Sequence, residues 1–498
     1  MRLDALLKPE AGDPENTLKT NAGLEIAGLC MDSRQMQPGD LFIAVAGGQQ
    51  HGLTYAEQAI AQGAVAVLVD AAVGEAAAKQ VEALSKGVVP VIRCPNLQRR
   101  LPALAAAFYG HPAERMQVMA VTGTNGKTST AHWMAQAWHL LGKKAGVLGT
   151  LGNGTWEQLH PSTHTTLDAV AIQRVLREMA DAGVSHLAME ASSHGLVQQR
   201  MQEIPVDWAV FTNLSHDHLD YHGTMQAYVE AKALLFSRPH LKAAVLNLDD
   251  PAAAVMRQAL DPAVQVVGYG QSATATLRLL NVTPWRQGMQ LLLDSPWGRG
   301  EVSTQVLGRF NAYNLMAVLS CLLVQGISWT SALALAAQLQ PVQGRMQTLR
   351  RPNAPLVVVD YAHTPDALEK VLLELRHSAA GRLICVVGCG GNRDTSKRPV
   401  MGRLASGLAD LCWLTADNPR HESPLDIVQQ MMTDLQRPVH VQLDRATAIA
   451  EAIAAAAVND TVLIAGKGHE TYQEIAGVRY PFDDVAIATT CLEARACG

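Results

Sequence analysis

Residues 118–129 combine the residue types that bind phosphate groups: Val-Met-Ala-Val-Thr-Gly-Thr-Asn-Gly-Lys-Thr-Ser. A short apolar run leads into a turn with two glycines, and a helix-compatible stretch follows. Gly123 and Gly126 allow backbone N–H groups to converge on anionic oxygens, and the start of a helix adds the positive end of its dipole. Lys127 can then reach the outer phosphates of a nucleotide, and the Thr128 hydroxyl can ligate Mg²⁺. The segment predicts nucleotide binding.

Two more polar segments follow predicted strands, where open α/β sheets place their ligand sites. Glu190 comes directly after an apolar run and can either ligate a nucleotide-bound Mg²⁺ or cap the next helix. Residues 213–222 hold three histidines and two aspartates, His218 among them. Their spacing differs from the helix-borne H-x-x-x-H pattern of zinc sites, so one Mg²⁺ contact is favoured over a zinc site.

Lys232 lies in a predicted helix, Met225–Phe236, between apolar neighbours. On its own, this pattern predicts a surface lysine whose stem packs on the protein while its ammonium stays in water. The alternative is a catalytic lysine, which nothing in the helix alone favours.

The last third of the chain has three further loops after predicted strands. Residues 386–394 form a glycine turn that ends in Arg393-Asp394, and residues 466–470 read Gly-Lys-Gly-His-Glu. In the third loop, residues 417–420, Pro419 fixes the turn and leaves Arg420 at its lip. A guanidinium held there suits bidentate recognition of a carboxylate, whereas the segment alone also fits a turn with a solvated arginine.

Composition is that of an ordinary globular protein, with 498 residues, 48% hydrophobic and 17% charged. The net charge of −5 gives no reason to expect nucleic acid or an anionic membrane as a partner. No stretch reaches the roughly 20 apolar residues that span a bilayer, and the N-terminus lacks a secretory signal. The eight cysteines are scattered without a C-x-x-C pair, so we expect reduced core thiols in a cytoplasmic protein.

Short β-branched runs alternate with amphipathic stretches of about twelve residues, which predicts parallel sheets covered by helices. The pattern divides into three blocks, residues 1–113, 114–341 and 342–498. The predicted strands are Leu41–Val45, Val65–Val69 and Val89–Ile92 in the first block; Ala145–Leu148, His186–Met189, Ala209–Thr212, Ala243–Asn247 and Gln265–Gly268 in the second; and Leu356–Asp360, Leu383–Val387, Leu411–Thr415, Val439–Gln442 and Val462–Ala465 in the third. Hairpin-like alternation is predicted over 276–307, and helices over Ala131–Leu141, Asn311–Gln325 and Trp329–Leu339.

These segments, in this order and over nearly the whole chain, resemble the Mur ligase family of ATP-dependent amino-acid ligases, which make peptidoglycan precursors. The similarity is closest to its diaminopimelate-adding members. The matching motifs are residues 32–34, 38–42, 122–128, 190–200, 213–223, 360–365 and 466–470. The family has its own shorter phosphate loop, which accounts for Val121 at the place where the general pattern has a glycine. Gln347 and Ser129 are small departures, at positions where relatives often carry Glu and Thr.

The resemblance implies a three-domain α/β fold. Residues 1–113 would form an N-terminal UDP-sugar-binding α/β domain, 114–341 a central ATP-binding domain with a P-loop ATPase-type parallel sheet, and 342–498 a C-terminal Rossmann-like domain that binds the amino acid. The small-molecule substrates would be ATP, UDP-N-acetylmuramoyl-L-alanyl-D-glutamate and meso-diaminopimelate. A monomer is expected, with no nucleic-acid or membrane partner.

The same resemblance implies the site residues. The UDP-muramoyl dipeptide would contact Met31, Ser33, Gly48, Gln49, Gln50, Thr165, Thr166, Ser192, Gln198 and Arg200. ATP would bind Gly123, Thr124, Asn125, Gly126, Lys127, Thr128, Ser129, Asn311, Arg345, Asp360 and His363. Mg²⁺ would be held by Thr128, Glu190 and His218, and a second Mg²⁺ by a CO₂-derived carbamate on Lys232. Diaminopimelate would meet Arg393, Asp417, Asn418, Pro419, Arg420, Gly466 and Glu470. Lys127, Glu190, His218 and Lys232 would be the catalytic group.

The implied reaction activates a carboxylate and then forms an amide. ATP would phosphorylate the γ-carboxylate of the D-glutamyl residue, and the amine of diaminopimelate would displace phosphate from the acyl phosphate. Arg420 suits the carboxylate that distinguishes diaminopimelate from lysine, and the three blocks are expected to close around their ligands. The alternatives are a lysine-adding muramyl ligase, an enzyme like folylpolyglutamate synthetase, and a P-loop ATPase without ligase activity.

Overall fold

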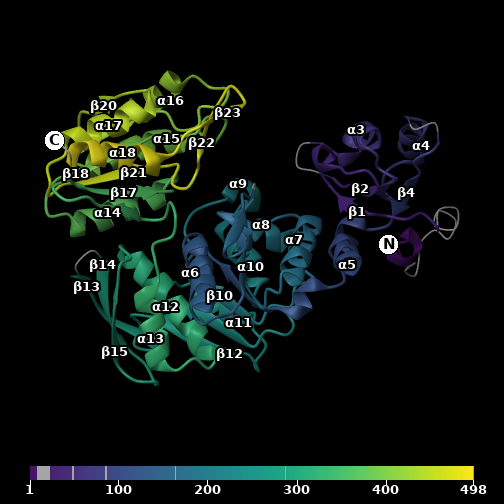
Figure 1. The fold of residues 1–498 in the computed structure, drawn as a ribbon, viewed down its shortest axis with the longest axis horizontal. Helices are drawn as coiled ribbons and strands as arrows, with labels where there is room; N and C mark the ends of the chain where they lie inside the picture. The colour runs from purple at the N-terminus through teal and green to yellow at the C-terminus, as the bar shows by residue number, and fades with distance from the viewer. Residues whose placement is uncertain (8–22, 47–49, 85–86, 163, 286–287, 497–498) are drawn as a thin grey trace.

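The computed structural model describes residues 1–7, 23–46, 50–84, 87–162, 164–285 and 288–496. Three sheets, each with its own helices, form three lobes that follow one another along the chain. In Figure 1 the purple N-terminal lobe and the yellow-green C-terminal lobe both stand on the blue-to-teal central lobe, with an open space between them. Within the described residues, no helix combines the length and apolar character needed to cross a membrane.

The N-terminal lobe is a four-stranded parallel sheet with the order β1-β2-β3-β4. Its strands are β1 (Gly28–Cys30), β2 (Asp40–Ala44), β3 (Ala66–Asp70) and β4 (Val91–Cys94), and its helices are α1 (Leu3–Leu6), α3 (Ala56–Ala61), α4 (Glu75–Leu84) and α5 (Leu97–Tyr109). The central strands β2 and β3 are almost wholly buried, as expected for apolar runs between two helical layers. The three predicted strands are present, whereas β1 is too short for its pattern to have been noticed.

The central lobe is built on an eleven-stranded sheet with the order β15-β14-β13-β12-β11-β10-β5-β9-β6-β7-β8. The strands from β12 to β6 are parallel: β5 (Gln117–Thr122), β6 (Ala145–Gly149), β9 (His186–Glu190), β10 (Trp208–Phe211), β11 (Ala243–Asn247) and β12 (Gln265–Gly270). At one edge β13 (Leu277–Trp285) pairs in parallel with β12, and β14 (Gly288–Asp294) and β15 (Gly300–Thr304) continue the sheet in antiparallel pairing. At the other edge, antiparallel pairing adds β7 (Gly152–Thr155) and β8 (Gln158–His160). The helices are α6 (Lys127–Leu140), α7 (Ala169–Asp181), α8 (Ser193–Val197), α9 (Leu219–His222), α10 (Met225–Ala233), α11 (Ala253–Gln258), α12 (Arg309–Val324) and α13 (Trp329–Gln338).

Both faces of this sheet are buried, which explains its continuous apolar strands. Along β5, Met119 and Val121 pack into one core with α6, α12 and α13, while Val118 and Ala120 pack into a second core on the opposite face. Alternate residues of one strand therefore pack into two different hydrophobic cores, one on each face of the sheet. The carboxyl ends of β10, β5, β9 and β6 lie side by side, and their loops share one edge of the sheet.

The C-terminal lobe has a six-stranded sheet with the order β16-β17-β21-β18-β19-β20, in which only β16 is antiparallel. Its strands are β16 (Gln347–Leu349), β17 (Leu356–Asp360), β18 (Leu383–Val387), β19 (Leu411–Leu414), β20 (His440–Val441) and β21 (Thr461–Ala465). Its helices are α14 (Pro365–Ser378), α15 (Lys397–Leu408), α16 (Pro424–Met431), α17 (Arg445–Ala455) and α18 (Asp484–Ala496). A separate hairpin, β22 (Tyr472–Ile475) and β23 (Val478–Pro481), joins β21 to α18.

The predicted helix starts differ from the observed ones at the phosphate loop. α6 begins at Lys127 rather than Ala131, because Gly126 caps it with a left-handed φ of +87° and the helix continues directly from the loop. α10 ends at Ala233, three residues before the predicted end. Six of the seven described cysteines are buried and all seven are free thiols, as the sequence predicted, and Cys497 lies outside the described residues.

Candidate active site

The loop between β5 and α6 has the geometry of a phosphate cradle. A Cβ on Gly126 would lie 2.3 Å from Oδ1 of Asn314, so no larger residue fits this left-handed position. The Asn213 carbonyl and side chain accept hydrogen bonds from the N–H groups of Thr124 and Asn125, at 2.8 and 3.0 Å. Lys127 folds back on the loop, and its Nζ donates to the carbonyls of Gly123 and Thr124 at 2.9 Å each. Asn213, which follows the neighbouring strand β10, therefore holds the phosphate loop. Lys127 lines the space over the loop.

Glu190 is the last residue of β9, and its side chain is directed at the start of α6. It is buried at 1% exposure. Its Oε2 accepts from the Thr128 hydroxyl at 3.0 Å, and its Oε1 accepts from the Thr150 N–H at 2.7 Å. The following helix, α8, is capped by Ser192, whose Oγ accepts from the Gly195 N–H. The capping role for Glu190 is therefore wrong, and a carboxylate and a hydroxyl face each other beside the loop, a pair of oxygen ligands that Mg²⁺ prefers.

Lys232 is buried rather than solvated, which contradicts the surface position predicted for it. Its exposure is 1%, and its Nζ donates to the Gly123 carbonyl at 2.9 Å and lies 4.4 Å from the centre of the Tyr228 ring. Burial, with the nearby Lys127 as a smaller contribution, lowers the pKa of Lys232 well below its ordinary value. An amine so placed favours its neutral, nucleophilic form.

The histidine-rich loop is a cluster of rings rather than a zinc site. His218 has a left-handed backbone and lies edge-on to His194, whose ring centre lies 4.1 Å from that of Tyr221 with the two rings tilted by 39°. Across the described ranges, no three His, Cys, Asp or Glu side chains are grouped so that they could hold a metal ion. Burial lowers the pKa of His218, which keeps a neutral imidazole available beside the loop.

The C-terminal lobe contributes a cation to the phosphate loop. Nη2 of Arg345 donates to the Thr128 hydroxyl at 3.2 Å, and its guanidinium lies 4.7 Å from the centre of the Tyr361 ring. Next to it, Asp360 accepts the N–H of Met346 at 2.7 Å, and burial raises the pKa of this carboxyl. Burial also lowers the pKa of His363 to about 4, so of Arg345, Asp360 and His363 it is Arg345 that supplies positive charge.

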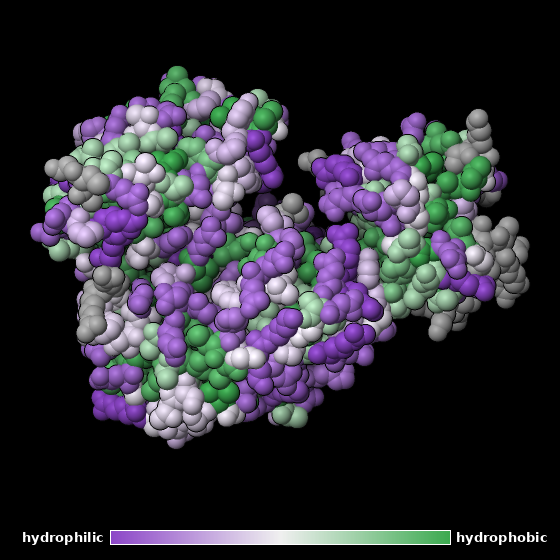
Figure 2. Space-filling model, in the orientation of Figure 1, coloured by the Kyte–Doolittle hydropathy of each residue, from purple (hydrophilic) through white to green (hydrophobic). Residues whose placement is uncertain are grey.

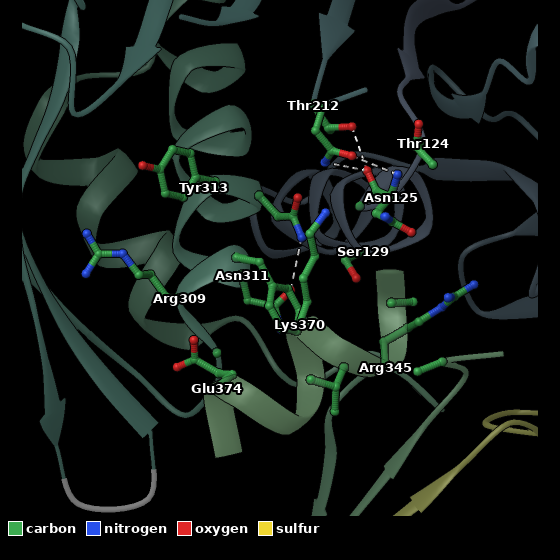
Figure 3. A pocket seen from close by; sticks show the side chains of 18 of the residues that line it. Thr124, Asn125, Ser129, Thr212, Arg309, Asn311, Tyr313, Arg345, Lys370 and Glu374 are labelled. Carbon is green, nitrogen blue, oxygen red and sulfur yellow. Dashed lines mark hydrogen bonds between the residues drawn. The ribbon is translucent and has the colours of Figure 1, made fainter. Parts of the chain in front are cut away.

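A cavity of about 1010 Å³ lies between the central and C-terminal lobes over the phosphate loop. Every residue predicted to bind ATP lines it except Gly123: Thr124, Asn125, Gly126, Lys127, Thr128, Ser129, Asn311, Arg345, Asp360 and His363. Figure 3 shows Ser129, Asn311, Lys370 and Arg345 around this cavity, and Arg345 comes more than two hundred residues after Ser129 in the chain. Glu190 and His218 line the same cavity as Thr128, so three of the four predicted metal residues lie with the ATP residues. Lys232 is not part of the lining and contacts the Gly123 carbonyl of the phosphate loop instead.

The residues predicted for the UDP-muramoyl dipeptide fall into two groups. Thr166, Ser192, Gln198 and Arg200 lie together, because Arg200 donates to the Thr166 carbonyl and the Gln198 side chain and Ser192 donates its N–H to Thr166 Oγ1. Thr165 joins them to the Glu190 region through Thr150 Oγ1 at 3.1 Å. The other group, Met31, Ser33 and Gln50, is on the N-terminal lobe, and Gly48 and Gln49 lie outside the described residues. Figure 2 shows the hollow that separates the N-terminal lobe from the C-terminal one.

The residues predicted for the amino acid gather at the carboxyl ends of β18, β19 and β21, outside the large cavity. Asn418 Nδ2 donates to Glu470 Oε2 at 2.8 Å, which joins the β19 loop to the β21 loop. Arg420 is not a solvated arginine: its side chain is 20% exposed, its Nη1 donates to the Gly391 carbonyl at 2.8 Å, and its Nε lies 3.5 Å from Glu474. Arg393 lies on the neighbouring loop and is exposed.

Sequence reasoning missed three residues that the structure places at these sites. Thr150 holds Glu190, and its position after β6, a neighbour of β9, was the available signal. Asp366 accepts from Asn125 Nδ2 at 3.1 Å and Ser215 Oγ at 2.9 Å, so the start of α14 is bonded to the phosphate loop. Lys467 is fully buried and contacts Asn418 and Glu470, two residues predicted to bind the amino acid. In the Gly-Lys-Gly-His-Glu motif, only Gly466 and Glu470 were predicted to bind it.

Comparison with known proteins identifies the family. Three family models match: "Mur ligase family, catalytic domain" over residues 25–109, "Mur ligase middle domain" over 121–322, and "Mur ligase, glutamate ligase domain" over 344–468. A UDP-N-acetylmuramoyl-L-alanyl-D-glutamate--2,6-diaminopimelate ligase of Chromobacterium violaceum is 46% identical over 486 residues, 97% of each chain. The ligase of the same name from Coxiella burnetii is 45% identical over 96% of this chain and 98% of that one.

Solved structures agree. A structure described by the same ligase name is 35% identical, covers 99% of both chains and superposes with a TM-score of 0.68. A MurF ligase from Thermotoga maritima, 19% identical with a TM-score of 0.64 over 95% of this chain and 99% of that one, shares the fold. The three-lobed α/β architecture and the resemblance expected from sequence are both confirmed. The chain belongs to the Mur ligase family.

Proposed function

We propose that this protein is an ATP-dependent ligase that adds meso-diaminopimelate to UDP-N-acetylmuramoyl-L-alanyl-D-glutamate. The observation that carries the proposal is the match over nearly the full length of both chains to ligases of that name. The arrangement of the predicted residues supports it, because they form one candidate site for each of three substrates. These sites are the cavity at the phosphate loop, the group of Thr166, Ser192, Gln198 and Arg200, and the cluster around Arg420.

ATP is assigned to the cavity between the central and C-terminal lobes. Lys127 and Arg345 would stabilise the charge that develops on the transferred phosphoryl group, since both reach the loop where the phosphates would lie. Mg²⁺ fits the facing oxygens of Thr128 and Glu190, with the neutral imidazole of His218 nearby. When bound, the metal would supply positive charge to the phosphate oxygens.

The buried amine of Lys232 fits the carbamate that family members carry. Reaction with CO₂ requires a neutral amine, and burial lowers the pKa of this one. The modification would replace a buried cation beside Lys127 with an anion suited to a second Mg²⁺. Tyr228 and the Gly123 carbonyl would hold the side chain in place.

The proposed reaction has two steps, phosphorylation of a carboxylate and then amide formation. The γ-carboxylate of the D-glutamyl residue attacks the γ-phosphorus of ATP, which releases ADP and leaves an acyl phosphate. The neutral amine of diaminopimelate then attacks the acyl carbon, loses a proton and displaces inorganic phosphate as the amide forms. A bare carboxylate is a poor electrophile, so phosphorylation supplies the leaving group.

The lobes divide the substrates among them. Residues 1–113 would bind the UDP-sugar end through Met31 and Ser33, while Thr166 and Arg200 of the central domain, 114–341, would hold the dipeptide end. The C-terminal domain, 342–498, would bind diaminopimelate, with Arg420 on its distal carboxylate. ATP and nucleotide-sugar precursors belong to the cytoplasm, so we expect the protein to act there, as a monomer.

A panel of acceptors tests the proposal. The purified protein is given ATP, Mg²⁺ and UDP-N-acetylmuramoyl-L-alanyl-D-glutamate with meso-diaminopimelate, L-lysine or L-ornithine, and the nucleotide product is identified by mass. Meso-diaminopimelate should be the preferred acceptor. Equal use of L-lysine would favour the lysine-adding alternative, and the absence of any tripeptide product would overturn the assignment.

A further inference from the structure

Lys467 is a fully buried lysine in the loop after β21, and it contacts three predicted amino-acid-binding residues. Its Nζ donates to Glu470 Oε2 at 2.9 Å and to Asn418 Oδ1 at 3.1 Å, and it lies 3.9 Å from Asp417 Oδ1. The Tyr472 ring covers it at 5.5 Å. An ammonium has three donors, so each can be directed at one of these three oxygens. The ammonium is therefore committed to the protein and is not available to a ligand.

These contacts fix the orientation of Asn418. Its Oδ1 accepts from both Lys467 and the Glu474 N–H, the latter at 2.9 Å, so its Nδ2 is directed at Glu470 Oε2. Glu470 Oε2 thus receives two donors, whereas no hydrogen bond among the described residues engages Glu470 Oε1. The carboxylate is held by one oxygen and presents the other to the site.

Lys467 also sets the charge of the cluster. Asp417 and Glu470 are two carboxylates with side-chain exposures of 8% and 16%, and Lys467 is the cation between them. Without it the pair would lose the cation that it contacts directly and keep only the field of the buried Arg445, and this excess negative charge raises the attraction for any ligand ammonium. With it, the pair does not compete for the guanidinium of Arg420, which is held by the Gly391 carbonyl and Glu474 and which the proposed function assigns to a ligand carboxylate.

We propose that Lys467 is a positioning and specificity-determining residue of the amino-acid site: it orients Asn418 and Glu470 and neutralises the Asp417–Glu470 pair, so that an acceptor with a distal carboxylate is preferred over one with a distal ammonium alone. This inference deepens the proposed function and rests on it. A purely structural role, in which Lys467 only stabilises the β21 loop, predicts lost stability without altered selectivity.

The test uses two substitutions and a matched control. Lys467→Met removes the charge and the donors, whereas Lys467→Gln removes the charge but keeps an amide donor for Asn418 and Glu470. Arg382→Met is the control, because Arg382 pairs with the buried Asp460 at 2.8 Å at the opposite end of β21. Initial rates are measured with meso-diaminopimelate and with L-lysine, and the KM for ATP is measured in parallel.

In Lys467→Met the KM for diaminopimelate should rise at least tenfold while the KM for ATP stays within twofold. The kcat/KM preference for diaminopimelate over L-lysine should fall at least tenfold in both variants, and Lys467→Gln should show the smaller rise in KM. Arg382→Met should keep the original preference.

The inference is overturned if both variants keep the KM and the preference within twofold, or if the KM values for ATP and amino acid rise equally. It is also overturned if both Lys467 variants are unfolded while Arg382→Met is folded, because Lys467 would then act in folding. If the unaltered protein uses none of the amino acids, the proposed function itself fails, which is a different result from an active protein with silent variants.

Discussion

At the scale of single residues, the site depends on buried polar groups that have hydrogen-bond partners within the protein. Glu190 is held by Thr128 and Thr150, while burial lowers the pKa of Lys232 well below its ordinary value. Each of these groups would be costly to bury without its partners, since an unsatisfied or unpaired group loses its solvation. Their retention in the interior is consistent with chemistry rather than with stability alone.

Glu190→Gln should reduce kcat by about 10²–10³, the range found when a single group that stabilises transition-state charge is removed. The amide keeps the shape of the side chain but weakens a metal-binding carboxylate. Steady-state kinetics at several Mg²⁺ concentrations measures the effect, and the apparent Mg²⁺ requirement should rise. An unchanged kcat would remove Glu190 from the catalytic group. The exposed Glu157, changed to Gln, serves as the control and should leave kcat unaltered.

His132 makes part of the stability dependent on pH. Burial, with a smaller contribution from Arg345, lowers its pKa from 6.5 to about 4. Because the unfolded chain binds the proton first as the pH falls, this stability is present above pH 6.5 and is lost between pH 6.5 and 4. The loss amounts to roughly 3–4 kcal/mol, from ~1.4 kcal/mol for each pKa unit between 6.5 and about 4.

Urea unfolding of the unaltered protein and of His132→Leu across this pH window isolates the contribution. The unfolding free energy of the unaltered protein should fall relative to that of His132→Leu as the pH is lowered. If the difference stays constant from pH 7 to pH 4, His132 is not buried in its neutral form.

At the scale of elements, strand ends place the chemistry and buried ion pairs hold the strand ends. Arg445 of α17 is fully buried, donates to both oxygens of Asp484 at the start of α18 at 2.8 and 2.7 Å, and donates to the Ala465 carbonyl at the end of β21 at 3.0 Å. Two helices are thus fixed to the end of β21, directly before the loop that contains Gly466 and Glu470. The Arg445–Asp484 ion pair therefore helps to position the loop that follows β21.

Asp484→Asn should lower the unfolding free energy by about 3–5 kcal/mol, because it leaves a buried guanidinium without its counter-charge. Asp434→Asn is the matched control in the same lobe: its pair with Arg403 is about half exposed and should contribute only ~0–1 kcal/mol. Thermal and urea unfolding measure both. Similar small losses in the two variants would show that the buried pair does not hold the lobe together.

Much of the arrangement of strands and loops could be predicted from the sequence. The phosphate loop, most of the buried strands and the loops after them have local signals, because parallel strands read as continuous apolar runs. Lys232 was misplaced because its surroundings, Gly123 and Tyr228, come from a separate strand end and from its own helix, and helical periodicity alone does not show what covers a helix. The contact of Arg345 with Thr128 joins residues 217 positions apart, and no local pattern shows it.

At the scale of the whole molecule, the candidate sites are shared among the three lobes. The ATP cavity joins the central and C-terminal lobes, and Asp366 already bonds α14 to the phosphate loop. The N-terminal lobe, with Met31 and Ser33, stands apart from the C-terminal lobe across the hollow in Figure 2. Because the acyl phosphate must be protected from water until the amine arrives, the lobes have to approach one another.

The radius of gyration should therefore decrease when ligands bind. Small-angle X-ray scattering is recorded for the free protein, with a non-hydrolysable ATP analogue alone, and with the analogue plus UDP-N-acetylmuramoyl-L-alanyl-D-glutamate. The last sample should be the most compact, since it engages all three lobes. The same radius in all three samples would mean that the arrangement in Figure 1 is already the working one.

The central claim, that the phosphate loop activates a carboxylate for amide formation with an amino acid, is tested most directly by the release of inorganic phosphate from ATP. Phosphate should appear only when UDP-N-acetylmuramoyl-L-alanyl-D-glutamate and meso-diaminopimelate are both present, with one phosphate released for each amide formed. Steady release from ATP alone, or with either partner omitted, would contradict the account and indicate an ATPase without ligase activity.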